Sequence, residues 1–239
     1  MRAPPCNDNR NMFHFATMRA REDRGRRILK VAVELAERGG FDAVRQREVA
    51  AQAGVALGTL YKRFASKEEL LMAALELEVE KFELRLKARP IKGANTVERL
   101  TSLFANALTG FVRKPNLGRA TIRATTSGPL SPSFMKYHAM LVGHIVDAID
   151  DEEAIAAGGP PLNAEQKRVF ALLLLQVWFT SLVGWATGVQ DPKSVARQIR
   201  LAADIMLRGL QAGAPTTVER RLPANGRGTS TKVRRVTAG

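Results

Sequence analysis

The sequence predicts an all-α protein built from a small N-terminal domain and a larger helical domain. Apolar residues recur every three or four positions along most of the chain, whereas no stretch alternates with the period of two typical of a half-buried strand. Helix-start signals such as Ser131-Pro132 and Asp191-Pro192 precede several of these segments. With 239 residues, 45% of them hydrophobic, the chain can bury one large core or two modest ones.

The first 66 residues divide into an arm and three short helices. Residues 1–21 are polar, and we expect a disordered basic arm there. A domain of residues 22–66 follows, whose first helix runs from Glu22 until Gly39-Gly40 ends its apolar pattern. Two shorter helices are expected over about 46–53 and 57–63, with Gly54 breaking the chain between them.

The second domain is expected over residues 67–212. Ser66 and Glu69 have the spacing of a capping box, which predicts a long helix to about Arg89. Further helical periodicity predicts helices over 96–113, 117–125, 132–155, 163–187 and 192–211. From 213 to 239, Gly, Pro, Thr and Arg mix without periodicity, which predicts a disordered basic tail.

The net charge of +14 favours an anionic partner, and the excess of Lys and Arg lies at both ends of the chain. Cys6 is the single cysteine, so no intrachain disulfide supports secretion, and we expect a cytoplasmic protein. The charge-free run 169–186 borders on the length of a transmembrane helix. A helix buried on all sides gives the same pattern, and we therefore expect no membrane partner.

The segment REVAAQAGVALGTLYKRF has the spacing of a helix-turn-helix. This motif needs a small residue where two helices cross, a residue that tolerates positive φ in the turn, and apolar residues that hold the second helix. Ala50 and Gly54 meet the first two requirements. The third is met by Val49, Val55, Leu60 and Phe64. With these side chains turned inward, the outer face of the second helix can lie in a DNA major groove.

The residues left on that face are candidates for contact with double-stranded DNA, because phosphate contacts supply affinity and base-edge contacts supply discrimination. The alternative is a helical hairpin with a solvated basic face, and the apolar spacing, rather than the charge, favours DNA binding. The DNA-binding candidates are Arg45 and Gln46 at a helix N-terminus, followed by Leu57, Gly58, Thr59, Tyr61, Lys62, Arg63 and Lys67.

Preceded by ILKVAVELAERGGFDAVRQREVAAQA, the segment GVALGTLYKRFASKEEL resembles the N-terminal domain of the TetR family of transcriptional regulators over about residues 24–71. The resemblance implies a homodimeric repressor that binds a near-palindromic operator and is released by a small effector. It marks Tyr61 and Lys67 as DNA-backbone contacts. Ala56 departs from the usual Ser or Thr cap, and Arg63 from the usual aromatic residue or His. An activator and a non-specific nucleoid-type DNA-binding protein remain alternatives.

The segment QVWFTSLVGWATGVQDPKSVARQIRLAADIMLRGL resembles the last two helices of the KstR-like steroid-catabolism repressors. This resemblance implies a small hydrophobic effector such as an acyl- or steroid-coenzyme A ester. Candidates for its pocket are large apolar residues and two arginines four positions apart, although core packing or solvation is the alternative for each. They are Phe104, Leu108, Phe111, Arg119, Arg123, Met135, Met140, Trp178 and Trp185.

Helices 163–187 and 192–211 carry more apolar surface than one subunit needs, which predicts a homodimer through a four-helix interface. Burial inside the monomer is the alternative. The expected interface residues are Val177, Phe179, Leu182, Val195, Ile199 and Ala203.

No pattern in the sequence indicates catalysis, a cofactor or a metal site. His138 and His144 lie six positions apart, unlike the two histidines of an H-E-x-x-H motif, and His14 lies in the predicted arm. No G-x-S-x-G elbow or phosphate-binding glycine loop is present. We therefore expect a regulator and not an enzyme.

Overall fold

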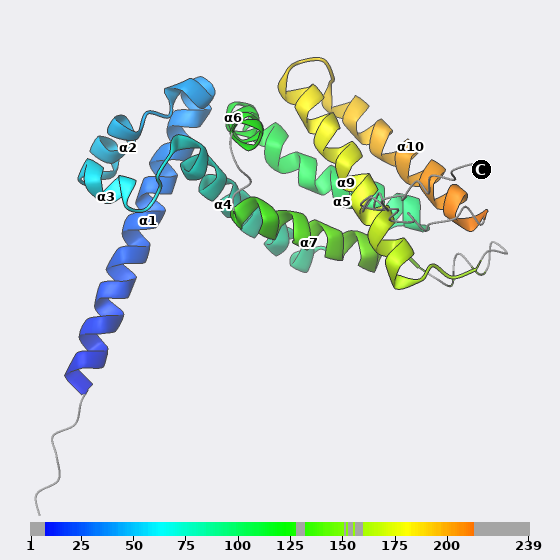
Figure 1. The fold of residues 1–239 in the computed structure, drawn as a ribbon, viewed down its shortest axis with the longest axis horizontal. Coiled ribbons are helices and arrows are strands. Elements are labelled where there is room, and N and C mark those ends of the chain that lie inside the picture. The colour runs from blue at the N-terminus through cyan, green and yellow to red at the C-terminus, as the bar shows by residue number, and fades with distance from the viewer. Residues whose placement is uncertain (1–7, 128–131, 151, 153–154, 156–159, 213–239) are drawn as a thin grey trace, which may run out of the picture.

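The computed structural model describes residues 8–127, 132–150, 152, 155 and 160–212, and it confirms the all-α prediction, because every element in this part of the chain is a helix. The helices α1, α2 and α3 form one end of the molecule, α4 leads away from them, and the later helices pack together at the other end (Figure 1). Their bounds are α1 (Asp8–Ala43), α2 (Gln46–Ala53), α3 (Leu57–Tyr61), α4 (Lys67–Ala88), α5 (Thr96–Arg113), α6 (Pro115–Thr126), α7 (Pro132–Ala148), α9 (Ala164–Ala186) and α10 (Pro192–Gln211).

Helix α1 differs from its prediction at its start. It begins at Asp8 and not near Glu22, so the expected disordered arm is helical over residues 8–21, while residues 1–7 lie outside the described residues. No Gly or Pro interrupts residues 8–24, and a helix already anchored by a packed turn extends with little further cost. The predicted break at Gly39-Gly40 is present, because Gly40 has φ 68° and ψ −156°. Helix α7 ends at Ala148, earlier than expected, and the expected tail over 213–239 lies outside the described residues.

The N-terminal core is shared by five helices. Ile28 and Leu35 of α1, Val49 of α2 and Leu60 of α3 are buried together, and Phe64 closes the cluster. The first turns of α4 and one face of α6 also belong to this core, through Leu70, Leu71, Met72, Leu117, Ala120 and Ala124. The DNA-binding domain predicted from the sequence therefore packs directly on α6.

Polar contacts reinforce the junction between α1 and α6. The Glu37 carboxylate accepts a hydrogen bond of 2.8 Å from the Leu117 N–H in the first turn of α6, and the Asn116 amide donates to the Glu37 carbonyl at 2.8 Å. At the other end of the junction, the Arg123 guanidinium donates to Asp42 at 2.8 Å and lies 4.3 Å from the centroid of the Phe41 ring. A carboxylate at a helix N-terminus is favourable, so Glu37 helps to fix the position of α6 on α1.

The larger core lies among α4, α5, α7, α9 and α10. The ring centroids of Phe104 and Trp178 are 5.0 Å apart. Those of Phe111 and Trp185 are 6.3 Å apart, in an edge-to-face arrangement. By length and composition α9 could cross a membrane, but 44% of its apolar window is buried in the protein. Its Ser181 hydroxyl also bonds to Gln198 of α10 at 2.8 Å. These contacts make α9 the central helix of this core.

Gly118 allows α6 to approach α9 closely. A Cβ atom at this position would lie 2.9 Å from the Trp185 ring and 3.0 Å from the Phe111 carbonyl oxygen. We expect Gly118→Ala to lower the free energy of unfolding by about 1–3 kcal/mol, because neither neighbour can move without disturbing the core. Urea unfolding measures this loss. The matched control is Gly143→Ala on α7, where a Cβ meets nothing within 4 Å, and there we expect unchanged or higher stability.

Candidate nucleic-acid interface and ligand pocket

The turn between α2 and α3 has the geometry that the sequence predicted for Gly54. This residue has φ 66° and ψ 40°, in the left-handed region that favours glycine. The Val55 N–H donates to the Ala50 carbonyl at 3.0 Å, which closes the turn. Ala56 gives α3 no side-chain cap. The direction of α3 therefore depends on the Gly54 turn and on the fully buried Leu60.

Four of the DNA-binding candidates have exposed positions near α3. Gly58, Tyr61 and Lys62 face solvent, with 46% of Tyr61 exposed, and Arg45 is exposed at the start of α2. A Cβ at Gly58 would meet nothing within 4 Å, so this side of α3 is open to close approach by a flat surface or a duplex edge. Thr59 is half-buried beside them.

The other four candidates have partners within the protein, and their assignment as DNA contacts stays a prediction. The Gln46 amide donates to the Phe64 carbonyl at 3.0 Å, and the Arg63 guanidinium donates to the Arg21 carbonyl at 3.2 Å. The Lys67 ammonium lies 3.9 Å from the Phe41 ring centroid, and Leu57 is half-buried against the core. These contacts with a carbonyl, a ring or apolar surface help to hold α3 in place, although Arg63 keeps an exposed position.

Sequence reasoning missed two arginines beside this face. Arg21 and Arg24 of α1 line a groove of about 730 Å³, partly open to solvent, together with Thr59 of α3 and Lys62 directly after it. Arg21 and Arg24 lie three positions apart on a helix that passes α3, and this spacing was the signal in the sequence for a basic surface beside α3. The groove extends the basic surface of the outward face of α3 along α1.

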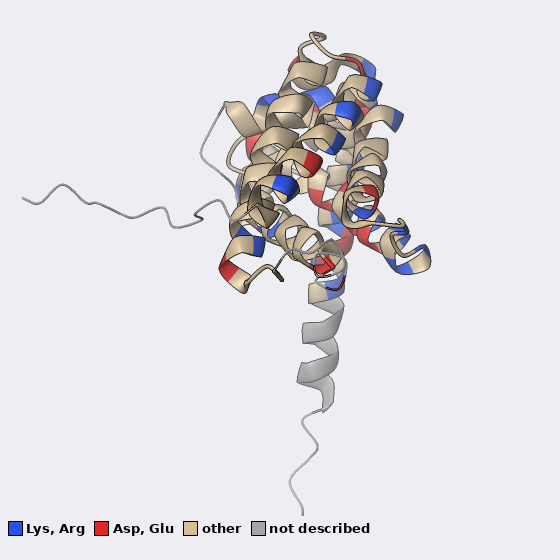
Figure 2. Cartoon of the chain, turned by 90° about the vertical axis from the view of Figure 1, so that its right-hand side faces the viewer, with Lys and Arg blue, Asp and Glu red and all other residues tan. Residues whose placement is uncertain are grey.

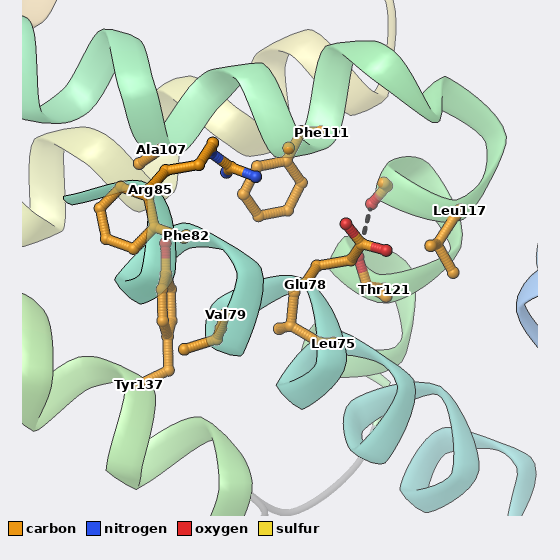
Figure 3. A pocket seen from close by; sticks show the side chains of 12 residues that line it. Leu75, Glu78, Val79, Phe82, Arg85, Ala107, Phe111, Leu117, Thr121 and Tyr137 are labelled. Carbon is orange, nitrogen blue, oxygen red and sulfur yellow. Dashed lines mark hydrogen bonds between the residues drawn. The ribbon is translucent and has the colours of Figure 1, made fainter. Parts of the chain in front are cut away.

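A pocket lies between α4, α5, α6 and α7 and encloses about 430 Å³ free of protein atoms, part of it open to solvent (Figure 3). Leu75, Val79 and Phe82 line it from one stripe of α4, and Phe111 lines it from α5. Its other lining residues include Ala107, Leu117, Gly118, Thr121 and Tyr137. The pocket is mostly apolar but contains two charged side chains of α4, Glu78 and Arg85.

Glu78 is held as a carboxylate. Its Oε1 atom lies 2.8 Å from the Lys81 ammonium and 3.0 Å from the Lys114 ammonium, and 14% of its side chain is exposed. Burial raises the pKa of Glu78, but the hydrogen bonds and charges of the two lysines outweigh burial and hold that pKa below its ordinary value. By contrast, burial raises the pKa of the Tyr137 hydroxyl well above its usual range, so Tyr137 is neutral and can donate a hydrogen bond.

Most of the predicted effector residues lie elsewhere. Phe111 lines this pocket, and Met140 lines an adjoining hollow that also touches Tyr137. For the other seven candidates a role in effector binding stays a prediction: the core buries four of these side chains, and three face other surfaces or partners. The buried four are Phe104, Leu108, Trp178 and Trp185, while Met135 is 52% exposed, Arg119 lies 5.5 Å from the Trp185 ring and Arg123 pairs with Asp42.

The expected dimer residues also need correction. Leu182, Val195, Ile199 and Ala203 are buried within the single chain, because they pack α9 against α10 and α5. Val177 and Phe179 are half-buried. The large apolar side chains that the two helices expose are Leu173 at 51%, Leu201 at 59% and Ile205 at 59%.

A helix-turn-helix head that shares a helix with an all-α, pocket-containing domain defines the class of ligand-responsive DNA-binding regulators. The chain belongs to the TetR family, and it is therefore a transcriptional regulator and not an enzyme. The description "Bacterial regulatory proteins, tetR family" matches residues 28–74, and "Tetracyclin repressor-like, C-terminal domain" matches residues 93–206.

Two curated relatives are similar over most of their length. The HTH-type transcriptional repressor KstR of Rhodococcus jostii is 32% identical over 188 residues, which are 79% of this chain and 84% of the relative. The KstR of Mycobacterium tuberculosis is 31% identical over 189 residues, covering 79% and 82% respectively. A TetR transcriptional regulator from Rhodococcus sp. RHA1 has a solved structure that matches with a TM-score of 0.67 and 27% identity, over 80% of this chain and 99% of that one.

The FadR repressor of Thermus thermophilus, solved in complex with lauroyl-CoA, shares the fold. Its TM-score is 0.56 at 23% identity, over 84% of this chain and 99% of that one.

The charges around Glu78 give a pH-dependent prediction. We expect Glu78→Gln to lower the free energy of unfolding by about 1–2 kcal/mol at pH 7, because it removes charge-assisted hydrogen bonds to Lys81 and Lys114. The pKa of Glu78 is lower in the folded state than its ordinary value of 4.5. The difference in free energy of unfolding between wild type and Glu78→Gln is therefore complete above pH 4.5, and it shrinks as the pH falls through the folded-state pKa. Urea unfolding over a pH series checks this. Exposed Glu80→Gln is the control and should show a small, flat difference; an equally flat difference for Glu78→Gln would contradict the assignment.

Proposed function

We propose that the protein binds a near-palindromic operator as a homodimer, represses transcription from it in the cytoplasm, and is released by a hydrophobic small-molecule effector. The observation that carries this proposal is the exposure of Gly58, Tyr61 and Lys62 on an α3 helix whose opposite side is anchored by buried Leu60. Such a helix can enter a major groove with these residues toward the bases and phosphates. The curated relatives named as repressors support the direction of control.

A dimer follows from the small size of the recognition helix. Helix α3 spans five residues, so one head reads few base pairs, and two heads on successive grooves multiply the selectivity. Leu173, Leu201 and Ile205 are the large apolar residues that α9 and α10 expose, and we assign them to the dimer interface, as the dimer strip, in place of the buried residues. Ser181 and Gln198 pair across the antiparallel α9 and α10, so Leu173 is roughly level with Ile205 along the two helices.

Effector release is proposed to act through α6. Leu117, Gly118 and Thr121 line the pocket, while the Leu117 N–H and Arg123 bind Glu37 and Asp42 of α1. A ligand that fits one position of α6 better than another shifts the angle of the DNA-binding head by its differential affinity, commonly ~1–3 kcal/mol. Helix α4 connects the same two regions, because its first turns belong to the N-terminal core and its middle lines the pocket.

We expect Lys62→Ala to weaken operator binding and to reduce the salt slope of log K by about 1, because one phosphate contact is lost, while stability changes by less than about 0.5 kcal/mol. The operator is first selected from genomic fragments, and affinity is measured by fluorescence anisotropy at several salt concentrations. Lys87→Ala on the far end of α4 removes the same charge and should leave DNA binding unchanged.

Competition with unrelated DNA at fixed salt tests the specificity of the proposed regulator. An operator preference of ~10³-fold or more is expected. Equal affinity for all duplexes would instead identify a non-specific nucleoid-type binder, and reporter expression from the operator distinguishes a repressor from an activator.

The dimer strip is tested by Leu201→Glu. A carboxylate in the middle of an apolar interface should produce monomers in analytical ultracentrifugation and reduce operator affinity at least ~10-fold, because the two heads then bind independently. The control is Val189→Glu, another exposed apolar residue but outside both helices. Dimers that survive Leu201→Glu would place the interface elsewhere.

A further inference from the structure

Arg85 differs from the other charged group of the pocket in having no polar partner. Glu78 is paired with Lys81 and Lys114, whereas the buried Nε–H of Arg85 donates to no acceptor among the residues that the structure describes. No hydrogen bond or ion pair joins its guanidinium to any of them. A buried, unsatisfied donor is unfavourable, and here it belongs to a residue that lines a pocket partly open to solvent.

The surroundings of Arg85 are apolar. Its guanidinium carbon lies 6.0 Å from the centroid of the Phe82 ring, and Ala107, Gly110 and Phe111 line the same part of the pocket from α5. A Cβ at Gly110 would sit 3.9 Å from the Nη2 atom, so α5 approaches the guanidinium without offering it an acceptor. The neutral Tyr137 hydroxyl is a further donor in this pocket.

The two charges of the pocket lie at different ends. Figure 3 shows Arg85 beside Phe82 and Phe111 at one side of the apolar side chains, and Glu78 near Leu117 and Thr121 at the other. A ligand that carries one anionic or carbonyl oxygen is therefore attracted to the Arg85 guanidinium, whereas Glu78 is already paired with Lys81 and Lys114. A guanidinium offers several donors in one plane, which suits a carboxylate or a carbonyl oxygen and disfavours a cationic ligand.

We propose that Arg85 binds the carboxylate or thioester carbonyl oxygen of an apolar effector, and that the hydrocarbon body of that effector lies against Leu75, Val79, Phe82 and Phe111. This rests on the proposed function, in which the pocket holds the effector, and it adds the polar group that the effector carries and the residue that binds it.

The test is direct binding of three probes to the full chain without DNA, measured by isothermal titration calorimetry. Laurate and lauroyl-CoA carry the proposed oxygen as an acid and as a thioester, and dodecanol has the same chain length without a carbonyl. We expect wild type to bind laurate, lauroyl-CoA or both at least ~10-fold more tightly than dodecanol. Arg85→Met should weaken the preferred probe by about 10- to 100-fold and leave dodecanol binding unchanged.

Two further variants keep the test independent of folding. Arg85→Lys retains the charge and should keep part of the preference, whereas Lys87→Met removes an exposed charge of the same helix and should behave as wild type. Urea unfolding of Arg85→Met verifies that it is folded. Which probe wild type prefers distinguishes a free acid from a thioester.

Three outcomes would overturn the inference. Equal binding of dodecanol and the two oxygen-bearing probes, or wild-type affinity in Arg85→Met, would remove Arg85 as the anchor and leave the apolar pocket as the effector site. Failure of all three probes to bind would overturn the inference together with the effector part of the proposed function. Operator binding, measured separately, would be unaffected by either result.

Discussion

The contact between α1 and α6 is the interaction on which the rest of the structure depends. Glu37 caps the first turn of α6, Asp42 pairs with Arg123 near its end, and Leu117, Ala120 and Ala124 fill the space between the two contacts. Because α6 also forms a wall of the pocket, the N-terminal core and the ligand pocket share one rigid element. Both ends of α6 are bonded to α1, the helix that carries the DNA-binding head. A movement of α6 therefore cannot be confined to one domain.

The polar residues of the DNA-binding head have two different roles. Gln46, Arg63 and Lys67 bind a carbonyl or a ring of the protein and so hold the short α3, whereas Tyr61 and Lys62 remain free to face outward. A five-residue helix without a side-chain cap has little stability alone, and these contacts replace what local sequence does not provide. On the side away from α3, Lys and Arg are scattered together with Asp and Glu over several helices (Figure 2).

The sequence predicted the head more accurately than the pocket, for physical reasons. Glycine at 54 and the apolar spacing of Val49, Leu60 and Phe64 are local signals, and the structure places these residues as expected. The pocket depends on which apolar residues stay partly exposed after packing, and α9 is apolar all round, so no periodicity separates its core face from its outer face. A charged pair within the apolar stripe of α4, Glu78 and Arg85, was the readable signal for the pocket. Val195, Ile199 and Ala203 form the strongest apolar stripe of α10, and the single chain buries this stripe, so such a stripe does not by itself identify a dimer surface.

Gly118 restricts how this protein can diversify. A side chain there would collide with Trp185, so that turn of α6 cannot be enlarged to reshape the pocket without dismantling the packing of α6 on α9. Substitutions that reshape the pocket and keep this packing are therefore confined to the stripes of α4 and α5 or to the Tyr137 side of α7. Substitutions at those positions leave the contacts between α6 and α1 unchanged.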